Sequence, residues 1–200
     1  VRTLCDDEGL LLIFDEIQCG LGRTGHLFAY QYYEVEPDIV TLAKALAGGL
    51  PIGAMLAKEQ VASAFGPGDH ASTFGGNPLV TAAGAAALKA LLSEGLVDNA
   101  RTLGQYFYRQ LLQLAREFPQ LKEVRGCGFL LGIEMDGPVN EVVAACQARG
   151  LLINSLHGHV LRFLPPLVVN REQVDQALGI LREALQEVLV EKADKASVSG

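Results

Sequence analysis

Three short apolar runs in the first part of the chain predict buried β-strands. Residues Leu10–Phe14 form a continuous run of this kind, with Asp15 at its C-terminal end, and Ile39–Leu42 and Ile52–Ala57 form two more. A continuous apolar run is typical of a strand that is covered on both faces of a parallel sheet. Because the intervening segments are long enough to cross over, the pattern predicts an α/β layer with a doubly wound, mostly parallel sheet.

The second part of the chain has helical periodicity, followed by a mixture of helices and strands. Ala82–Leu92 predicts a buried helix, and Leu96–Phe118 predicts a long amphipathic helix. The remaining runs predict a smaller α+β unit, with strands near Gly128–Glu134, Leu151–Ser155 and Val160–Phe163 and helices near Val139–Arg149 and Arg171–Val190.

This change in pattern predicts two domains, residues 1–94 and 95–200. The last residues, 191–200, are small and polar and are expected to be frayed. The chain opens with Val1-Arg2-Thr3 instead of Met and soon enters a strand-like run. We therefore expect it to begin inside a domain.

Composition and charge narrow the range of partners. A net charge of −7 and a pI near 5.1 argue against a nucleic-acid partner, because nothing would neutralise a run of phosphates. No apolar run approaches the roughly 18–20 residues that cross a bilayer, and no signal peptide precedes the first strand. The four cysteines have no C-x-x-C spacing. They predict reduced thiols in a cytoplasmic protein and no metal site. The lack of a membrane-length apolar run predicts no membrane partner.

Lys44 is the first candidate for chemistry. It lies between apolar residues in Thr41-Leu-Ala-Lys-Ala-Leu-Ala47, an unusual setting because lysine is rarely buried without a partner. Desolvation would favour the neutral amine, which a Schiff-base lysine requires. A lysine at a helix end whose amine reaches back to water is the competing interpretation, and the local sequence does not decide between them.

Asp15 is the second candidate, because ligands of open α/β sheets gather at the carboxyl ends of strands. A structural role as a turn cap is the alternative. On an extended chain Asp15 and Ile17 would point to one side and offer a carboxylate and an apolar face to one planar ligand. In pyridoxal chemistry such a carboxylate keeps the ring nitrogen protonated. Ile17 would lie against that ring, and Gln18 would donate a hydrogen bond to its phenolate oxygen.

Gly20-Leu-Gly-Arg-Thr-Gly25 matches the G-x-G-x-x-G fingerprint of dinucleotide-binding proteins. Five residues separate it from the preceding strand, whereas the fingerprint needs an immediate turn. The aromatic segment His26–Tyr33 that follows has no convincing helix start. A dinucleotide-binding oxidoreductase therefore remains only a remote alternative.

Two further segments suggest anion sites. In Asp69-His-Ala-Ser-Thr-Phe-Gly-Gly-Asn-Pro78, the hydroxyls of Ser72 and Thr73 beside a Gly-Gly pair suit a phosphate, although a simple turn into the next helix fits as well. Arg162 stands alone on an apolar strand and needs a carboxylate partner, either a structural acid or a substrate.

Taken together, these segments resemble the class III aminotransferases of the fold type I pyridoxal-phosphate family. The similarity covers essentially the whole chain in order. It rests on Phe14-Asp-Glu-Ile-Gln-Cys-Gly-Leu-Gly-Arg-Thr-Gly25, Pro37-Asp-Ile-Val-Thr-Leu-Ala-Lys44, Pro51-Ile-Gly-Ala54, Ser72-Thr-Phe-Gly-Gly-Asn-Pro78 and Arg162-Phe-Leu-Pro-Pro166.

The resemblance implies roles for the same residues with pyridoxal 5′-phosphate as cofactor. Lys44 would hold the cofactor as a Schiff base and Asp15 would pair with its ring nitrogen. Ile17 would pack on the ring and Gln18 would approach the phenolate oxygen. Thr73 would bind the phosphate of the neighbouring subunit's cofactor in a homodimer.

For the substrates, the resemblance places Ser72 near the amino donor and assigns Arg162 to the carboxylate of 2-oxoglutarate or glutamate. Ala45, Ala47 and Ala71 stand where glycines are common in the family. The family's Gly-rich phosphate turn, its ring-stacking aromatic residue and its second carboxylate-binding arginine would all precede Val1. We therefore expect residues 1–94 to be part of the cofactor-binding large domain, 95–200 to be the small domain, and this half-chain alone to be inactive, at most a dimerising fragment.

Overall fold

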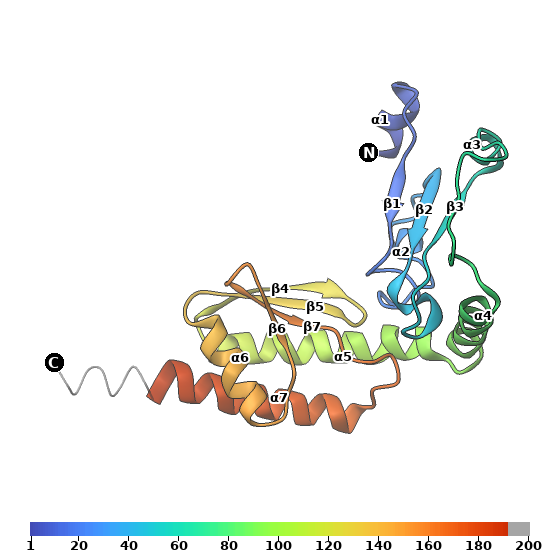
Figure 1. Cartoon of the computed structure of the whole chain (residues 1–200). Coiled ribbons are helices and arrows are strands. Elements are labelled where there is room, and N and C mark those ends of the chain that lie inside the picture. Colours follow the sequence, from blue (N-terminus) through green and yellow to red (C-terminus); the bar gives the residue numbers. More distant parts are fainter. Residues whose placement is uncertain (192–200) are drawn as a thin grey trace. The chain divides into compact units, whose positions relative to one another are not determined.

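The computed structural model describes residues 1–191, with side chains to 189, and its contacts divide the chain into two compact units (Figure 1). The first unit is Val1–Asp98 and the second starts at Asn99. The expected boundary at 94/95 lies at the turn that contains Gly95, whereas the contacts divide the chain a little later, inside helix α5 (Leu96–Glu117). Of the residues expected to be frayed, all but Glu191 lie outside the described part.

The first unit contains a three-stranded mixed sheet in the order β1-β2-β3 (Figure 1). Its strands are β1 (Ile13–Asp15), β2 (Ile39–Leu42) and β3 (Ala54–Ala57). β1 and β2 are parallel, and β2 has the predicted bounds, but β3 runs antiparallel to β2. The link from β2 to β3 holds only a short 3-10 turn, η1 (Lys44–Ala47), and a Gly-Pro turn. A parallel connection needs a crossover of a dozen or more residues, usually a helix.

The expected burial of β1 on both faces is wrong for the described chain. Leu10, Leu11 and Ile13 are 56%, 55% and 55% exposed. Burial on both faces requires covering helices and a neighbouring strand on each side. Within residues 1–191, β1 pairs with β2 alone.

The helix predicted to be buried is also largely exposed. This helix, α4 (Pro78–Ser93), buries Val80, Gly84 and Leu91, whereas Leu92 is 62% exposed. Its buried side packs on η1, where Gly84 faces the Leu46 carbonyl oxygen. The first unit thus leaves one side of α4 without a covering layer among the described residues.

Three short helices of this unit were not predicted. They are α1 (Arg2–Asp7), α2 (Ala29–Tyr33) and α3 (Glu59–Ala62). Helices of four to six residues are too short for a hydrophobic period to show in the sequence.

Asp38, just before β2, contacts three other segments of the first unit through its side chain. It is 7% exposed, and its Oδ2 accepts a 2.8 Å hydrogen bond from the Leu12 N–H. Arg2 Nη1 lies 2.8 Å from the same oxygen, and Lys58 Nζ lies 3.4 Å from Oδ1. The Leu12 hydrogen bond, and then the Arg2 side chain, lower the pKa of Asp38 from 3.8 to about 2.

The second unit packs three helices against a four-stranded antiparallel sheet in the order β4-β5-β7-β6 (Figure 1). Its elements are α5 (Leu96–Glu117), β4 (Leu121–Cys127), β5 (Leu130–Met135), α6 (Val139–Ala148), β6 (Asn154–Leu156), β7 (Val160–Phe163) and α7 (Arg171–Leu185), followed by a π-helical segment, η2 (Gln186–Glu191). The predicted α5, α6, α7, β5 and β7 are confirmed with small shifts in bounds. β6 is confirmed as a strand but starts three residues later than expected, and β4 was not predicted.

The core of the second unit lies between the helices and the sheet. Phe107, Leu111 and Leu114 of α5 follow a helical period and are almost fully buried. Gly104 continues this stripe, and a Cβ added there would lie 2.5 Å from the carbonyl carbon and oxygen of Gly128. Glycine at position 104 therefore lets a helix and a β-turn touch through their backbones.

Among the described residues, no single helix has both the length and the apolar character needed to span a membrane. The consecutive helices α4 and α5 meet that criterion only when they are taken together.

Gly104→Ala is expected to lower the free energy of unfolding by about 1–3 kcal/mol, because the added methyl group overpacks a backbone contact. Gly179→Ala is the matched control, since Gly179 also lies inside a helix but has nothing within 4 Å of the added Cβ. It should raise stability by about 0.5–1 kcal/mol through helix propensity. Urea unfolding measures both, and equal effects would contradict the assigned contact.

Asp38→Asn should remove a pH-dependent part of the stability. Because folding lowers the pKa of Asp38 from 3.8 to about 2, its contribution is complete above pH 3.8 and disappears as the pH falls towards 2. The gap in urea midpoint between wild type and Asp38→Asn should therefore close between about pH 6 and about pH 2. A gap that stays constant across this pH range would contradict a stabilising role for the ionised Asp38 carboxylate.

Candidate functional site

The parallel pairing of β1 and β2 brings Asp15 and Lys44 to the same edge of the sheet. Asp15 is the last residue of β1 and lies in register with Thr41 of β2. The Glu16 N–H donates a 3.0 Å hydrogen bond to the Thr41 carbonyl. Lys44 begins the 3-10 turn just after β2. The two candidate residues thus share the carboxyl edge at which α/β sheets bind ligands.

Lys44 differs from the expectation in its exposure. Within residues 1–191 its side chain is exposed instead of desolvated. Its backbone has φ +50°, in the left-handed region that side-chain-bearing residues rarely adopt. Such strain costs on the order of 1–3 kcal/mol and is concentrated at functional sites. Leu21, Glu34 and His157 have a similar φ, so this strain is compatible with a functional role for Lys44 but does not assign one by itself.

Asp15 lies at the start of a turn. Its Oδ1 accepts a 3.0 Å hydrogen bond from the Ile17 N–H, and its side chain is exposed. The strand ends at Asp15 and Ile17 lies in the turn that follows, so the expected extended backbone does not continue through Ile17. That the two side chains face one ligand stays a prediction. Ile17 is half-buried and Gln18 is exposed in the same turn. Asp15 Oδ2 has no partner among the described residues, so it remains available to a ligand N–H.

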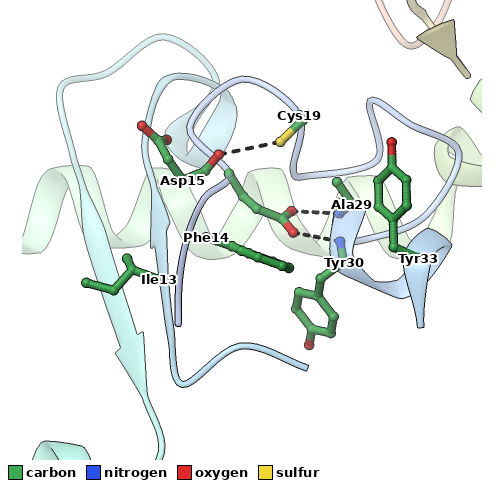
Figure 2. A pocket seen from close by; sticks show the side chains of 8 residues that line it. Ile13, Phe14, Asp15, Cys19, Ala29, Tyr30 and Tyr33 are labelled. Atoms are coloured by element: carbon green, nitrogen blue, oxygen red, sulfur yellow. Dashed lines mark hydrogen bonds between the residues drawn. The ribbon is translucent and has the colours of Figure 1, made fainter. Parts of the chain in front are cut away.

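A pocket of about 160 Å³ lies beside this turn (Figure 2). Its lining residues are Ile13, Phe14, Asp15, Glu16, Cys19, Ala29, Tyr30 and Tyr33. Figure 2 shows the Asp15 side chain directed away from Ala29 and Tyr30. Cys19 Sγ donates to the Asp15 carbonyl oxygen at 3.6 Å and closes the turn.

Glu16 is the site residue that the sequence analysis did not identify. It is only 2% exposed, although it follows the exposed Asp15 directly. Its carboxylate accepts hydrogen bonds from the N–H groups of Ala29 and Tyr30 at 2.7 and 2.8 Å. These two donors begin α2, so Glu16 caps the start of this helix together with Gln31, whose Oε1 accepts the Phe28 N–H. The partners lie 13 and 14 residues away, and no local pattern reveals them.

Ser72 and Thr73 lie in an exposed loop that leads into α4. Ser72 Oγ accepts a 2.9 Å hydrogen bond from the Gly75 N–H, and Asn77 Oδ1 caps α4 through the N–H groups of Leu79 and Val80. The turn interpretation therefore accounts for Ser72 and Asn77. In the described part of the chain, no hydrogen bond connects Thr73 to Asp15 or Lys44, and its phosphate role stays a prediction.

Arg162 occupies β7, between β5 and β6 in the second unit. Its register neighbours are Gly132 and Asn154. It is half-buried, and its buried Nε has no hydrogen-bond partner among residues 1–191. A buried donor without a partner is expensive, which favours a ligand carboxylate over a structural acid.

The G-x-G-x-x-G segment forms turns and not a phosphate-binding loop. Gly22 and Gly25 have positive φ, and the helix that follows is the short α2, which begins only at Ala29. Its first two free N–H groups are already occupied by Glu16. Dinucleotide fingerprints instead direct a helix N-terminus at the pyrophosphate, so this arrangement argues against nucleotide binding.

Comparison with known proteins agrees with the aminotransferase interpretation. Residues 1–185 match the family model described as Aminotransferase class-III. The chain is 49% identical over 187 residues to acetylornithine aminotransferase of Clostridium acetobutylicum, covering 93% of this chain and 48% of that protein. It is 52% identical over 190 residues to acetylornithine aminotransferase of Thermosynechococcus vestitus, covering 92% and 46%.

Solved structures give the same result. Ornithine delta-aminotransferase of Plasmodium falciparum superposes with a TM-score of 0.89 at 38% identity, covering 94% of this chain and 49% of that one. Acetylornithine aminotransferase of Elizabethkingia anophelis gives 0.88 at 37% identity, covering 93% and 48%. The chain thus spans about half the length of the relatives that it matches. With a family match over nearly its whole length, the chain belongs to the class III aminotransferases.

Proposed function

We propose that this chain is part of a pyridoxal-phosphate-dependent aminotransferase that transfers the terminal amino group of N2-acetyl-L-ornithine to 2-oxoglutarate, a reaction of arginine biosynthesis. The observation that carries the proposal is the common sheet edge of Asp15 and Lys44. The names of the relatives and the motifs Gln18-Cys-Gly20, Ser72-Thr-Phe-Gly-Gly-Asn-Pro78 and Arg162-Phe-Leu-Pro-Pro166 support the choice of donor.

The residues at this edge fit the cofactor. An aspartate with an unpartnered carboxylate oxygen suits a protonated ring nitrogen, and an exposed lysine amine suits covalent attachment. When bound, pyridoxal phosphate supplies an aldehyde carbon and an electron-withdrawing ring. Asp15 would hold the proton on the ring nitrogen. Ile17 would pack on the ring, Gln18 would donate to the phenolate oxygen, and Thr73 would bind the phosphate of a partner subunit's cofactor in a homodimer.

Lys44 would act twice. Its Nζ would first hold the cofactor, and after the donor amine displaces it, the free amine would take the proton from the substrate carbon that bears the nitrogen. Lys44 would then deliver this proton to the cofactor. Ser72 would lie beside the donor.

Arg162 would bind a carboxylate of 2-oxoglutarate and later of glutamate. Its unpartnered buried Nε supports this role, because a carboxylate would satisfy the orphaned donor. The two substrates would bind in turn, since the amino group stays on the enzyme between the half-reactions.

The proposal concerns a protein of the relatives' length, of which this chain spans about half. Ornithine, succinylornithine or 4-aminobutyrate as donor are the alternatives, and the similarity to ornithine aminotransferase structures favours ornithine among them. A panel of these amines, compared by kcat/KM, decides the donor.

Replacing Lys44 should separate stability from function. Lys44→Gly should raise the free energy of unfolding by about 1 kcal/mol, because glycine relieves the left-handed strain. Lys44→Ala keeps the strain and should change stability by less than about 0.5 kcal/mol. Both variants, made in the full-length protein, should lose transamination by at least about 10³-fold if Lys44 both holds the cofactor and moves the proton. A Lys44→Ala enzyme with wild-type turnover would refute the assignment.

Arg162→Gln should weaken the second half-reaction selectively. Loss of a charge-assisted hydrogen bond of about 1.5–3 kcal/mol predicts that KM for 2-oxoglutarate rises about 10–100-fold. The single-turnover rate with the amino donor alone should stay near wild type. Arg125→Gln is the control, because Arg125 already pairs with Glu123 and Glu134 at the surface. Equal effects of Arg162→Gln on both half-reactions would contradict a carboxylate role.

A further inference from the structure

Glu16 connects the two strands of the site through its backbone as well as its side chain. Its N–H donates to the Thr41 carbonyl at 3.0 Å, and its carbonyl accepts from the Gly20 N–H at 3.0 Å. It is also the middle residue of the turn in which the Ile17 N–H holds Asp15 Oδ1. The orientation of the Asp15 carboxylate therefore depends on a turn that Glu16 anchors at several points.

The side chain of Glu16 completes this anchor. Each carboxylate oxygen accepts a hydrogen bond from one backbone N–H at the start of α2, so two N–H donors face this buried side chain. An ionised carboxylate satisfies both donors with its two oxygens. An amide at this position would leave one donor facing an NH₂ group and unpaired.

Gly20 makes the anchor possible by leaving room for it. A Cβ at position 20 would lie 2.8 Å from the Glu16 carbonyl oxygen and 2.9 Å from its Oε2. Gly20 is not among the glycines with positive φ, so glycine is needed there for close approach and not for an unusual backbone. The first glycine of the apparent dinucleotide fingerprint thus has a structural explanation in the Glu16 contact.

We propose that Glu16 is a positioning residue of the aminotransferase reaction. Seated against Gly20 and bonded to α2, it fixes the turn that directs the Asp15 carboxylate at the ring nitrogen of the cofactor. This inference rests on the proposed role of Asp15. In this proposal Glu16 acts through Asp15 and not on cofactor or substrate, since each of its oxygens accepts a backbone N–H of α2.

Two variants disturb the anchor in different ways in the full-length holoenzyme. Glu16→Gln keeps the shape of the side chain but loses one acceptor, whereas Gly20→Ala keeps the charge and displaces the carboxylate. Asp38→Asn is the matched control, since Asp38 is another buried carboxylate of the first unit that accepts a backbone N–H, but at the opposite end of β2. Asp15→Asn is the reference variant, because it removes the proposed contact with the ring nitrogen directly and so shows how that loss changes the readouts.

The readouts are the pH titration of the bound cofactor's visible absorption and the steady-state constants. Glu16→Gln and Gly20→Ala should shift the titration midpoint in the same direction as Asp15→Asn and lower kcat about 10–100-fold, as expected when a reacting group is misplaced. KM should change by less than about 3-fold, because substrate contacts remain. Asp38→Asn should lower the melting temperature and leave both the midpoint and kcat at wild-type values.

The outcomes separate the two proposals. If Asp15→Asn shifts the midpoint but Glu16→Gln and Gly20→Ala resemble Asp38→Asn, Glu16 is only structural and the inference is overturned. If Asp15→Asn leaves the midpoint unchanged, the role of Asp15 in the proposed function fails first, and the positioning role fails with it.

Discussion

The parallel pairing of β1 with β2 is the constraint on which the candidate site depends. With Asp15 in register with Thr41, the turn after β1 and the 3-10 turn after β2 emerge at the same sheet edge. The Glu16 N–H bonded to Thr41 extends this pairing one residue beyond the strand. A carboxylate and an amine that are 29 residues apart in sequence therefore belong to one edge, and neither would suggest the site alone.

Around this edge, stability and function make different demands on neighbouring residues. Glu16 is buried and fully bonded, whereas Asp15 beside it keeps an oxygen free. Lys44 retains a left-handed backbone that glycine would adopt without strain. The carboxylates of Glu16 and Asp38 thus accept hydrogen bonds that hold segments together, whereas Asp15 Oδ2 at the sheet edge has no partner among the described residues.

The sequence predicted those features whose signals are local. Apolar runs, and the polar, Gly or Pro residues that bound them, predict strand β2 and helix α5. They also predict that strands end near Asp15 and Lys44. Strand β4 was missed because a register shift between Leu121 and Glu123 breaks its alternation. Other features depend on contacts between residues that are distant in the sequence, or on the lack of such contacts. These are the direction of β3, the exposure of β1 and α4, and the role of Glu16. The extended backbone expected through Ile17 is not found, because the strand ends at Asp15 and a turn follows it.

The central claim, that Lys44 holds the cofactor opposite Asp15, is tested most directly by locating the cofactor. The full-length protein is loaded with pyridoxal phosphate, reduced with borohydride, digested and analysed by mass spectrometry. The account predicts a reduced pyridoxyl group on the peptide that carries Lys44, and none on the peptides that carry Lys58 or Lys89. Stoichiometric labelling of another lysine, with Lys44 unmodified, would contradict it.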